Sequence, residues 1–401
     1  MFRRYLLPVI VILSAAMAAD AGATSVYSMF LLGEPIESGE VRSISLGGST
    51  QIVDDSLGVV QLNPALLSRV PRVSIGATQY LAVDEGRNSE YTERDISFTF
   101  SSFRAVFPIA GLFRFAVGYT GRYEPGSGFT LRGETEGGDE YSQRFEKSGG
   151  LYSVPLTVAF DLTRFASFGL TFSFEQGTIE NQWIIVFDEF GFTSGAGIQK
   201  EDLSGHGLAA GVLLRPFGGL VLGGMYEDAI EYDALISERY STSSLDTAYT
   251  ANLTLPRRVV LGATARLGND FIVLASGSWR DFGAVEGQAI PEGGLGAEQS
   301  VSVGAEWLRG VRVGGIRFPL RWGFKYEQAP FEYPAGEKVE KFLVTIGTGV
   351  RVRGGKGKLD IGIQGGRAGS LGANGIEDRL VRLYIGIAGG EEWKKKGAEL
   401  F

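Results

Sequence analysis

Side chains alternate between apolar and polar at every second position through much of this chain, and no other feature constrains its fold as strongly. The clearest example is residues 316–327, IRFPLRWGFKYE. Its apolar set is Ile316, Phe318, Leu320, Trp322, Phe324 and Tyr326, with Arg317, Arg321, Lys325 and Glu327 between them. A β-strand sends alternate side chains to opposite faces, so this segment has one aromatic, apolar face and one charged face. Such a strand either covers a soluble core or turns its apolar face to lipid.

The same alternation recurs along the chain and predicts about fourteen strands. It is strongest in 112–123, 299–308, 339–352 and 379–388. Weaker versions lie near 72–82, 94–106, 151–162, 165–176, 203–215, 218–228, 256–267, 270–281 and 358–366.

Connections between these segments alternate in length. Short turns, such as 162–166 and 268–270, are followed by long polar loops near 83–93, 124–150, 177–202, 229–254, 282–298, 328–338 and 367–378. This sorting, an even strand number and strands of about ten residues are typical of a transmembrane β-barrel. A soluble β-sandwich, the alternative, does not sort its loops by length. The sequence therefore predicts an all-β fold, an antiparallel barrel with apolar faces toward lipid and charged faces toward the lumen.

Composition excludes several other classes of protein. The 401 residues include no cysteine and one histidine, His206, and carry a formal charge of −8. Neither a thiolate site nor a multi-histidine site is possible, so no metal and no cofactor is expected. The negative charge argues against a nucleic-acid partner. His206 with a serine would suggest a hydrolase, but no orienting third group accompanies it, so we expect no enzyme.

The N-terminus reads as a secretory signal peptide covering residues 1–23. Arg3 and Arg4 precede an apolar run that is too short to span a bilayer, and small residues follow it. The alternative is an uncleaved anchor. An exported chain without spanning helices can still cross a membrane, but only as a closed barrel.

Residues 24–70 precede the first predicted strand and are the expected plug. A barrel of about eight strands is filled by its own side chains, whereas a larger one encloses space that something must fill. The segment 41–80, VRSISLGGSTQIVDDSLGVVQLNPALLSRVPRVSIGATQY, contains the acidic pair Asp54-Asp55 and then Asn63-Pro64-Ala65. It resembles the hatch of the FadL/TodX-type family of outer-membrane transporters for long-chain fatty acids and other hydrophobic compounds.

The resemblance implies a hatch over 24–70, a fourteen-stranded barrel over 71–389 and a periplasmic tail over 390–401. Members of that family capture hydrophobic, fatty acid-like substrates outside the cell and release them sideways into outer-membrane lipid, passively and without covalent chemistry. The location implied is the outer membrane of a Gram-negative bacterium. Either Trp393 or Phe401 would supply the terminal aromatic through which the outer-membrane assembly machinery recognises such a barrel.

Several residues become candidate sites on this interpretation. Strand parity places a basic set in the lumen, where it would either hold a fatty-acid carboxylate or pair with acids such as Asp54, Asp55, Glu306 and Asp360. The basic set is Arg114, Arg122, Arg317, Arg321, Lys325, Arg351 and Arg382. Gly118 and Gly121 would mark the strand kink of a lateral exit, or merely ease curvature. Residues 181–192, NQWIIVFDEFGF, are the candidate for an external apolar groove.

Two other functions remain open at this stage. PorV-like barrels of protein secretion resemble the same family and hold cargo and partners instead of passing lipid. A general porin is the other alternative, and a substantial plug argues against it.

Overall fold

The computed structural model describes residues 25–48, 52–53, 55–89, 92–109, 112–134, 140–187, 194–241, 246–283, 294–352 and 355–391. The predicted signal peptide, Asp54, Trp393, Phe401 and the end of the candidate groove (188–192) lie outside these ranges. None of the helices within the described ranges is long and apolar enough to cross a membrane.

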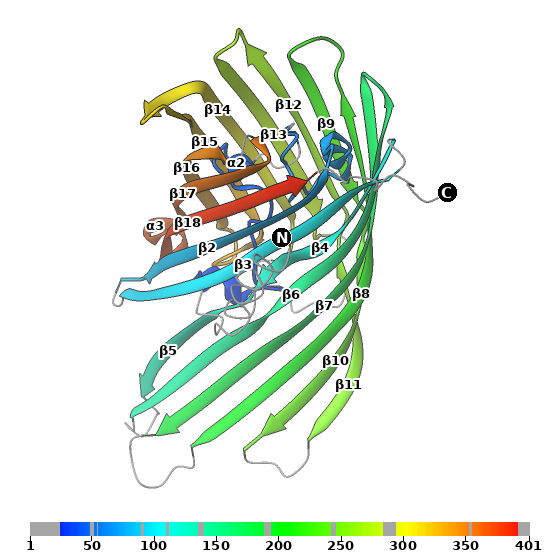
Figure 1. The fold of residues 1–401 in the computed structure, drawn as a ribbon. Coiled ribbons are helices and arrows are strands. Elements are labelled where there is room, and N and C mark those ends of the chain that lie inside the picture. The colour runs from blue at the N-terminus through cyan, green and yellow to red at the C-terminus, as the bar shows by residue number, and fades with distance from the viewer. Residues whose placement is uncertain are drawn as a thin grey trace.

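One antiparallel sheet closes on itself, because its last strand pairs with its first full-length strand (Figure 1). The strands are β2 (Val73–Arg87), β3 (Thr92–Ile109), β4 (Phe113–Glu124), β5 (Ser127–Glu134), β6 (Glu140–Thr163), β7 (Ala166–Phe187), β8 (Gly195–Leu214), β9 (Leu220–Glu227), β10 (Ile230–Tyr240), β11 (Thr247–Leu255), β12 (Arg258–Leu267), β13 (Phe271–Asp281), β14 (Ala297–Val313), β15 (Ile316–Glu332), β16 (Lys338–Val352), β17 (Gly357–Ser370) and β18 (Ile376–Glu391).

Three pairs of these strands each form one interrupted wall strand. β4 and β5 both pair with β6, β9 and β10 both pair with β8, and β12 continues β11. The wall therefore has fourteen strands, and the predicted transmembrane barrel is confirmed.

The two faces of the wall show which way the apolar face of residues 316–327 points. Trp322 and Phe324 are 44% and 41% exposed on the outside of β15, whereas Arg321 and Lys325 are buried on the inside. The same outward, apolar exposure recurs at Val301 in β14 and Val344 in β16. The apolar faces point to lipid and the charged faces point into the barrel.

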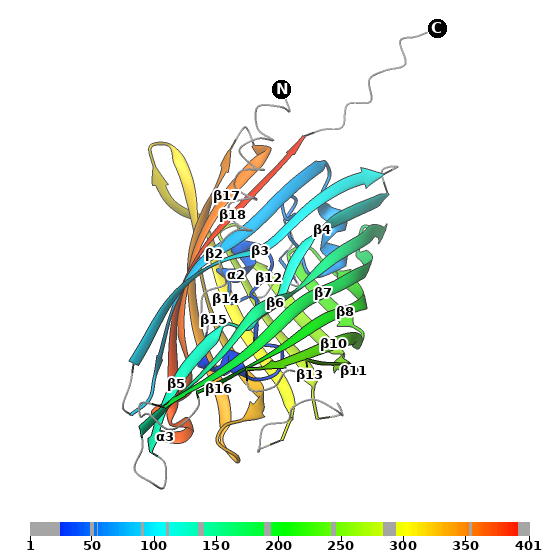
Figure 2. The same ribbon diagram turned by 90° about the horizontal axis from the view of Figure 1, so that it is seen from below.

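The prediction of long loops at 124–150, 177–202 and 229–254 was wrong. Most of these residues lengthen the strands, so that β5, β6, β7, β8, β10 and β11 run past their neighbours (Figures 1 and 2). We call this sheet of residues 127–134, 140–150, 177–187, 195–204, 230–240 and 247–255 the extension. The outward face of the extension carries charges such as Arg144, Lys200 and Arg239, because the extension lies beyond the lipid. Its sequence is therefore as polar as that of a loop.

The described residues of the N-terminal segment (25–70) lie inside the ring of strands. Their short elements are η1 (Val26–Met29), β1 (Glu34–Pro35), α2 (Val41–Ile44) and η2 (Pro64–Arg69). Contacts with β3, β7, β14 and β17 show that the segment touches the wall on several sides. A further one-turn helix, α3 (Leu371–Asn374), connects β17 to β18.

Candidate functional site

The Asn63-Pro64-Ala65 motif begins the helix η2. The Asn63 side chain accepts a hydrogen bond from the backbone N–H of Ala65 at 3.0 Å and donates one to the carbonyl of Gly224 in β9 at 3.2 Å. Pro64 occupies the first helical position, where a missing N–H costs nothing. One residue thus caps the helix and ties it to the wall.

Glycines in the wall let the backbone of η2 approach closely. A Cβ atom at Gly211 of β8 would lie 2.0 Å from Asn63 Oδ1, and one at Gly169 of β7 would lie 2.4 Å from the Pro64 carbonyl carbon. Any larger residue at either position would push the helix away. This contact explains part of the high glycine content, 59 of 401 residues.

A buried ion-pair network joins the N-terminal segment to β14 and β15. Arg42 of α2 donates to Glu306 of β14, with Nη2 2.6 Å from Oε2. Glu306 also accepts from Arg321 at 2.9 Å, and Arg321 reaches Asp360 at 2.6 Å. These side chains are almost completely shielded from solvent, so each charge depends on its partners.

The network continues through Lys358 of β17. Its Nζ lies 2.6 Å from Glu40 Oε2 and 3.1 Å from Asp55 Oδ2, and both carboxylates belong to the N-terminal segment. Burial raises the pKa of the Glu40 carboxyl to about 7, despite the opposing effect of Lys358. Burial alone would also raise the pKa of Asp55, but Lys358 and Arg42 outweigh it and hold that pKa well below its usual range.

A second group of ion pairs holds the start of the segment. Glu34 pairs with Lys341 of β16 and, at 2.8 Å, with Arg382 of β18. Glu37 pairs with Lys325 of β15 at 2.8 Å. The segment is therefore bound by charge to several strands of the wall.

The structure does not bring the basic set from the sequence together as one anion site. Arg122 pairs with Glu175 at 3.1 Å and with Glu227 at 2.5 Å. Arg114 donates to the carbonyl of Val70 at 2.6 Å.

Two of the basic set lie near the short-turn end. Arg351 is largely exposed and lies 3.7 Å from Asp55. Arg317 is exposed and directly opposite Arg312. Most of the buried members of the set thus neutralise carboxylates of the wall or of the N-terminal segment.

The wall is interrupted where β4 turns inward. β3 and β4 pair only from Ser102 opposite Thr120 to Ile109 opposite Phe113. Beyond this point β4 pairs with β1 inside the barrel, and β5 pairs with β6 alone among the described strands. Residues 92–101 of β3 therefore have a ladder only on the side of β2 among the described strands.

The two predicted kink glycines lie at this turn of β4. A Cβ at Gly118 would be 2.1 Å from the Phe103 carbonyl oxygen, and one at Gly121 would be 2.7 Å from Ile36 Cδ1. The register of β4 against β6 shifts directly after Gly121.

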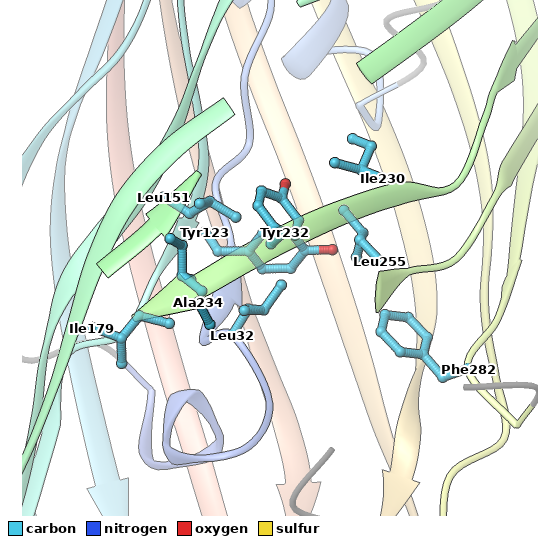
Figure 3. Close-up of a cluster of buried hydrophobic side chains, with 10 residues drawn as sticks. Leu32, Tyr123, Leu151, Ile179, Ile230, Tyr232, Ala234, Leu255 and Phe282 are labelled. Atoms are coloured by element: carbon cyan, nitrogen blue, oxygen red, sulfur yellow. The ribbon is translucent and has the colours of Figure 1, made fainter. Parts of the chain in front are cut away.

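A cluster of buried apolar side chains lies inside the barrel at the base of the extension (Figure 3). Leu32 of the N-terminal segment packs there against Tyr232 of β10, with wall residues around them. The wall members are Tyr123, Leu151, Ile179, Leu203, Ile230, Ala234, Leu255 and Phe282.

The inner face of the extension continues this apolar surface away from the barrel, along the strands. Strand pairing places Phe145 opposite Trp183 and Tyr141 opposite Phe187 on the side of Ile179, which belongs to the buried cluster. The Tyr141 and Phe187 rings are 5.9 Å apart. The candidate groove from the sequence contains Trp183 and Phe187. Sequence reasoning missed Tyr141 and Phe145, although they alternate in the same way.

Hydrolysis at His206 and metal binding are the two other chemistries that the sequence raises. The ring of His206 lies against Phe172 and Phe174 on the outside of the wall, 5.7 and 5.5 Å between centroids. Within the described ranges, no group of three or more Asp, Glu or His side chains is arranged to hold a metal ion.

Comparison with protein families gives a match over more than half of the chain. The family model described as BamG matches residues 1–216. The chain belongs to the BamG family. A search of curated proteins finds no match.

Solved structures resemble this BamG-family chain over nearly their whole length. A FadL homologue of Pseudomonas aeruginosa is 11% identical, with a TM-score of 0.63, covering 90% of this chain and 99% of that one. The P. putida toluene transporter TodX is 15% identical (TM-score 0.59, 89% and 100% covered). The Ralstonia pickettii toluene transporter TbuX is 13% identical (TM-score 0.59, 88% and 98% covered). The FadL/TodX-type fold implied by the sequence is thereby confirmed.

Proposed function

We propose that this BamG-family protein lets hydrophobic compounds pass the outer membrane of a Gram-negative bacterium, after removal of residues 1–23. The observation that carries the proposal is the apolar surface running from the inner face of the extension to Leu32 in the barrel. An apolar solute gains about 0.8 kcal/mol for each CH₂ that leaves water. Such a surface therefore gives it a favourable route past the polar outer leaflet without an energy source.

In this proposal the N-terminal segment acts as the hatch. Its ion pairs with β14, β15, β16, β17 and β18 hold the passage closed in the state described here. Movement of Leu32 and the residues around it would open a way from the apolar cluster toward β4.

Release would take place sideways, where β4 leaves β3. A compound leaving beside Gly118 and Gly121, where β4 turns inward below the extension, enters lipid directly and avoids the periplasmic water. The toluene transporters among the structural neighbours share this fold, which favours hydrophobic cargo.

A second candidate is a binding role in outer-membrane protein assembly or secretion, as in PorV-like barrels. The hairpin tip 309–319 favours it, because β15 pairs with β16 only from Leu320 onward and the tip stands out from the wall (Figure 2). Val311, Val313 and Ile316 are 46%, 61% and 49% exposed there. A partner could cover this apolar face.

The test compares uptake through outer membranes whose only added barrel is this protein. Labelled toluene, labelled oleate and a small sugar are offered to the wild type and to two variants of adjacent β7 residues. Ile185→Asn places an amide on the inner face, and Ile184→Asn places it on the outer face.

We expect toluene uptake without sugar leakage, severalfold lower in Ile185→Asn and unchanged in Ile184→Asn, and oleate uptake would show that the route also accepts a carboxylate. Sugar passage in the wild type would mean a porin. Absence of any flux would overturn the transport proposal and leave the binding role.

A further inference from the structure

One cluster on the inner face of the extension combines aromatic rings with a carboxylate. Trp183 of β7 lies over Gly197 of β8, where a Cβ atom would be 2.3 Å from the indole ring. The Trp183 and Tyr240 rings meet edge to face at 5.8 Å. Tyr240 and Tyr249 are 37% and 47% exposed, so the cluster is open to solvent.

Glu238 is the charged group of this cluster. Its Oε2 accepts from the Tyr240 hydroxyl at 3.1 Å, and its Oε1 accepts from the Tyr249 hydroxyl at 3.1 Å and from Gln199 Nε2 at 3.3 Å. These donors fix the carboxylate among the aromatic side chains, which come from three strands. Hydrogen bonds of this kind hold a charged group in one place without neutralising it.

Charges on the inner face of the extension are otherwise few and mostly acidic. Among its described residues the inward charged positions are Glu201, Glu238 and Lys147. Lys147 is buried, and its Nζ is held by the carbonyls of Met29 and Leu31. The extension's other basic residues, such as Lys200, point outward. An incoming carboxylate therefore meets a carboxylate and no accessible cation.

We infer that this cluster of Trp183, Tyr240, Tyr249 and Glu238 binds organic ammonium ions that carry an aromatic or aliphatic body. Aromatic faces attract cations through the negative potential of the ring, and a neighbouring carboxylate adds to this attraction. The same geometry disfavours fatty-acid anions, whose carboxylate would be desolvated beside Glu238 without a partner. The inference rests on the proposed function, since the cluster lies at the start of the proposed route.

The test uses three probes of one shape: 4-phenylbutylammonium, 4-phenylbutan-1-ol and 4-phenylbutanoate. Binding to the purified full chain in detergent is measured by equilibrium dialysis and by tryptophan fluorescence. The variants are Glu238→Gln, which removes the inward charge, and Glu231→Gln, which removes an outward charge from the same strand. Trp183→Phe identifies the fluorescence signal of the site.

We expect the ammonium probe to bind about tenfold more tightly than the alcohol, and the carboxylate most weakly. Glu238→Gln should bring the ammonium probe to the level of the alcohol, and Glu231→Gln should leave the order unchanged. Equal binding of all three probes would overturn the inference while leaving transport of neutral compounds intact. Loss of the ammonium preference in Glu231→Gln would also overturn it, because the effect would then be that of net charge.

Discussion

Arg42 ties the N-terminal segment to the wall through a charge that is almost fully buried. Its guanidinium contacts Glu306 and Asp55, and Glu306 is shared with Arg321. A buried ion pair adds little net stability over an apolar pair, but loss of one partner leaves a charge without compensation. Arg42 is therefore important mainly because its loss would leave buried carboxylates without a compensating charge.

Arg42→Ala should lower the free energy of unfolding by about 3–5 kcal/mol, since Glu306 and Asp55 would each lose a buried partner. Urea unfolding in lipid vesicles, followed by tryptophan fluorescence, measures this. Arg309→Ala is the control, because Arg309 is 67% exposed in its pair with Asp270 and should cost less than about 1 kcal/mol. Equal costs for the two variants would show that burial does not govern the Arg42 pair.

Gly211→Ala should displace η2, because the added methyl group would lie 2.0 Å from Asn63 Oδ1. We expect the free energy of unfolding to fall by about 1–3 kcal/mol and residues 64–69 to be cleaved faster by protease. Gly218→Ala provides the comparison, since a Cβ atom there meets nothing within 4 Å. If protease cleaved η2 equally slowly in Gly211→Ala and Gly218→Ala, the position of the helix would not depend on Gly211.

Glu40 should make the seating of the N-terminal segment depend on pH. Its pKa is raised to about 7 from 4.5, so the seated segment holds a proton more tightly than a released one. The associated stability is fully present below pH 4.5 and is lost as pH rises to about 7. The charged groups facing Glu40 are Lys358, Asp55 and Asp360.

Protease should therefore cleave the N-terminal segment at a lower temperature at pH 8 than at pH 5. Glu40→Gln should remove most of that difference. A pH dependence that survives in Glu40→Gln would assign it to another group.

At the scale of elements, β1 is the only strand of the N-terminal segment within the described residues. Its Pro35 lies opposite Tyr123 of β4, and the next pair is hydrogen-bonded through Ile36 N–H and the Arg122 carbonyl. Pro35 and Tyr123 thus form a non-hydrogen-bonded pair, in which the two Cα atoms are about 4.5 Å apart. This spacing suits a disulfide.

A Pro35→Cys, Tyr123→Cys double variant should lock the segment to β4 when oxidised. The chain has no other cysteine, so the bond forms without competition. If the segment must move, uptake of toluene should fall at least severalfold in the oxidised form and recover after reduction. The reduced form of the same protein serves as the control. Full uptake through the oxidised form would exclude movement of β1 from the mechanism.

The wall was predictable from the sequence, and so was the alternative in which lumen bases pair with acids such as Asp55, Glu306 and Asp360, but not which base meets which acid. Alternation in β15 is local information, and it identified both faces before any partner was known. The extension was missed because its outward side chains, such as Arg144 and Lys200, are as polar as those of a loop. Arg42 and Glu306 are 264 positions apart, and no local pattern links them. The Asn63 motif was identified only through resemblance.

For the whole molecule, the proposed function makes the N-terminal segment the part that determines whether the barrel is open. Deletion of residues 25–62 should deprive inward charges such as Glu306, Lys358 and Arg382 of their partners in the N-terminal segment, and water should hydrate them. We expect sugar-permeable vesicles and single-channel conductance in planar bilayers, where the full chain gives neither. Heat-modifiable migration in gels checks that the barrel still forms. A folded, non-conducting barrel would show that the wall side chains alone close the lumen.

The pairing of β18 with β2 also sets an order of events during biogenesis. The seam joins residues 73–87 to residues 376–391. In a chain exported as proposed above, the ring cannot be completed until almost the whole chain has left the cytoplasm. Residues 25–70 would then leave the cytoplasm first, whereas their partners on β14 to β18 would arrive last. The segment must therefore wait beside an open sheet and be enclosed as the seam forms. If the seam closed too early, the N-terminal segment would stay outside the barrel and could not enter without unfolding the seam.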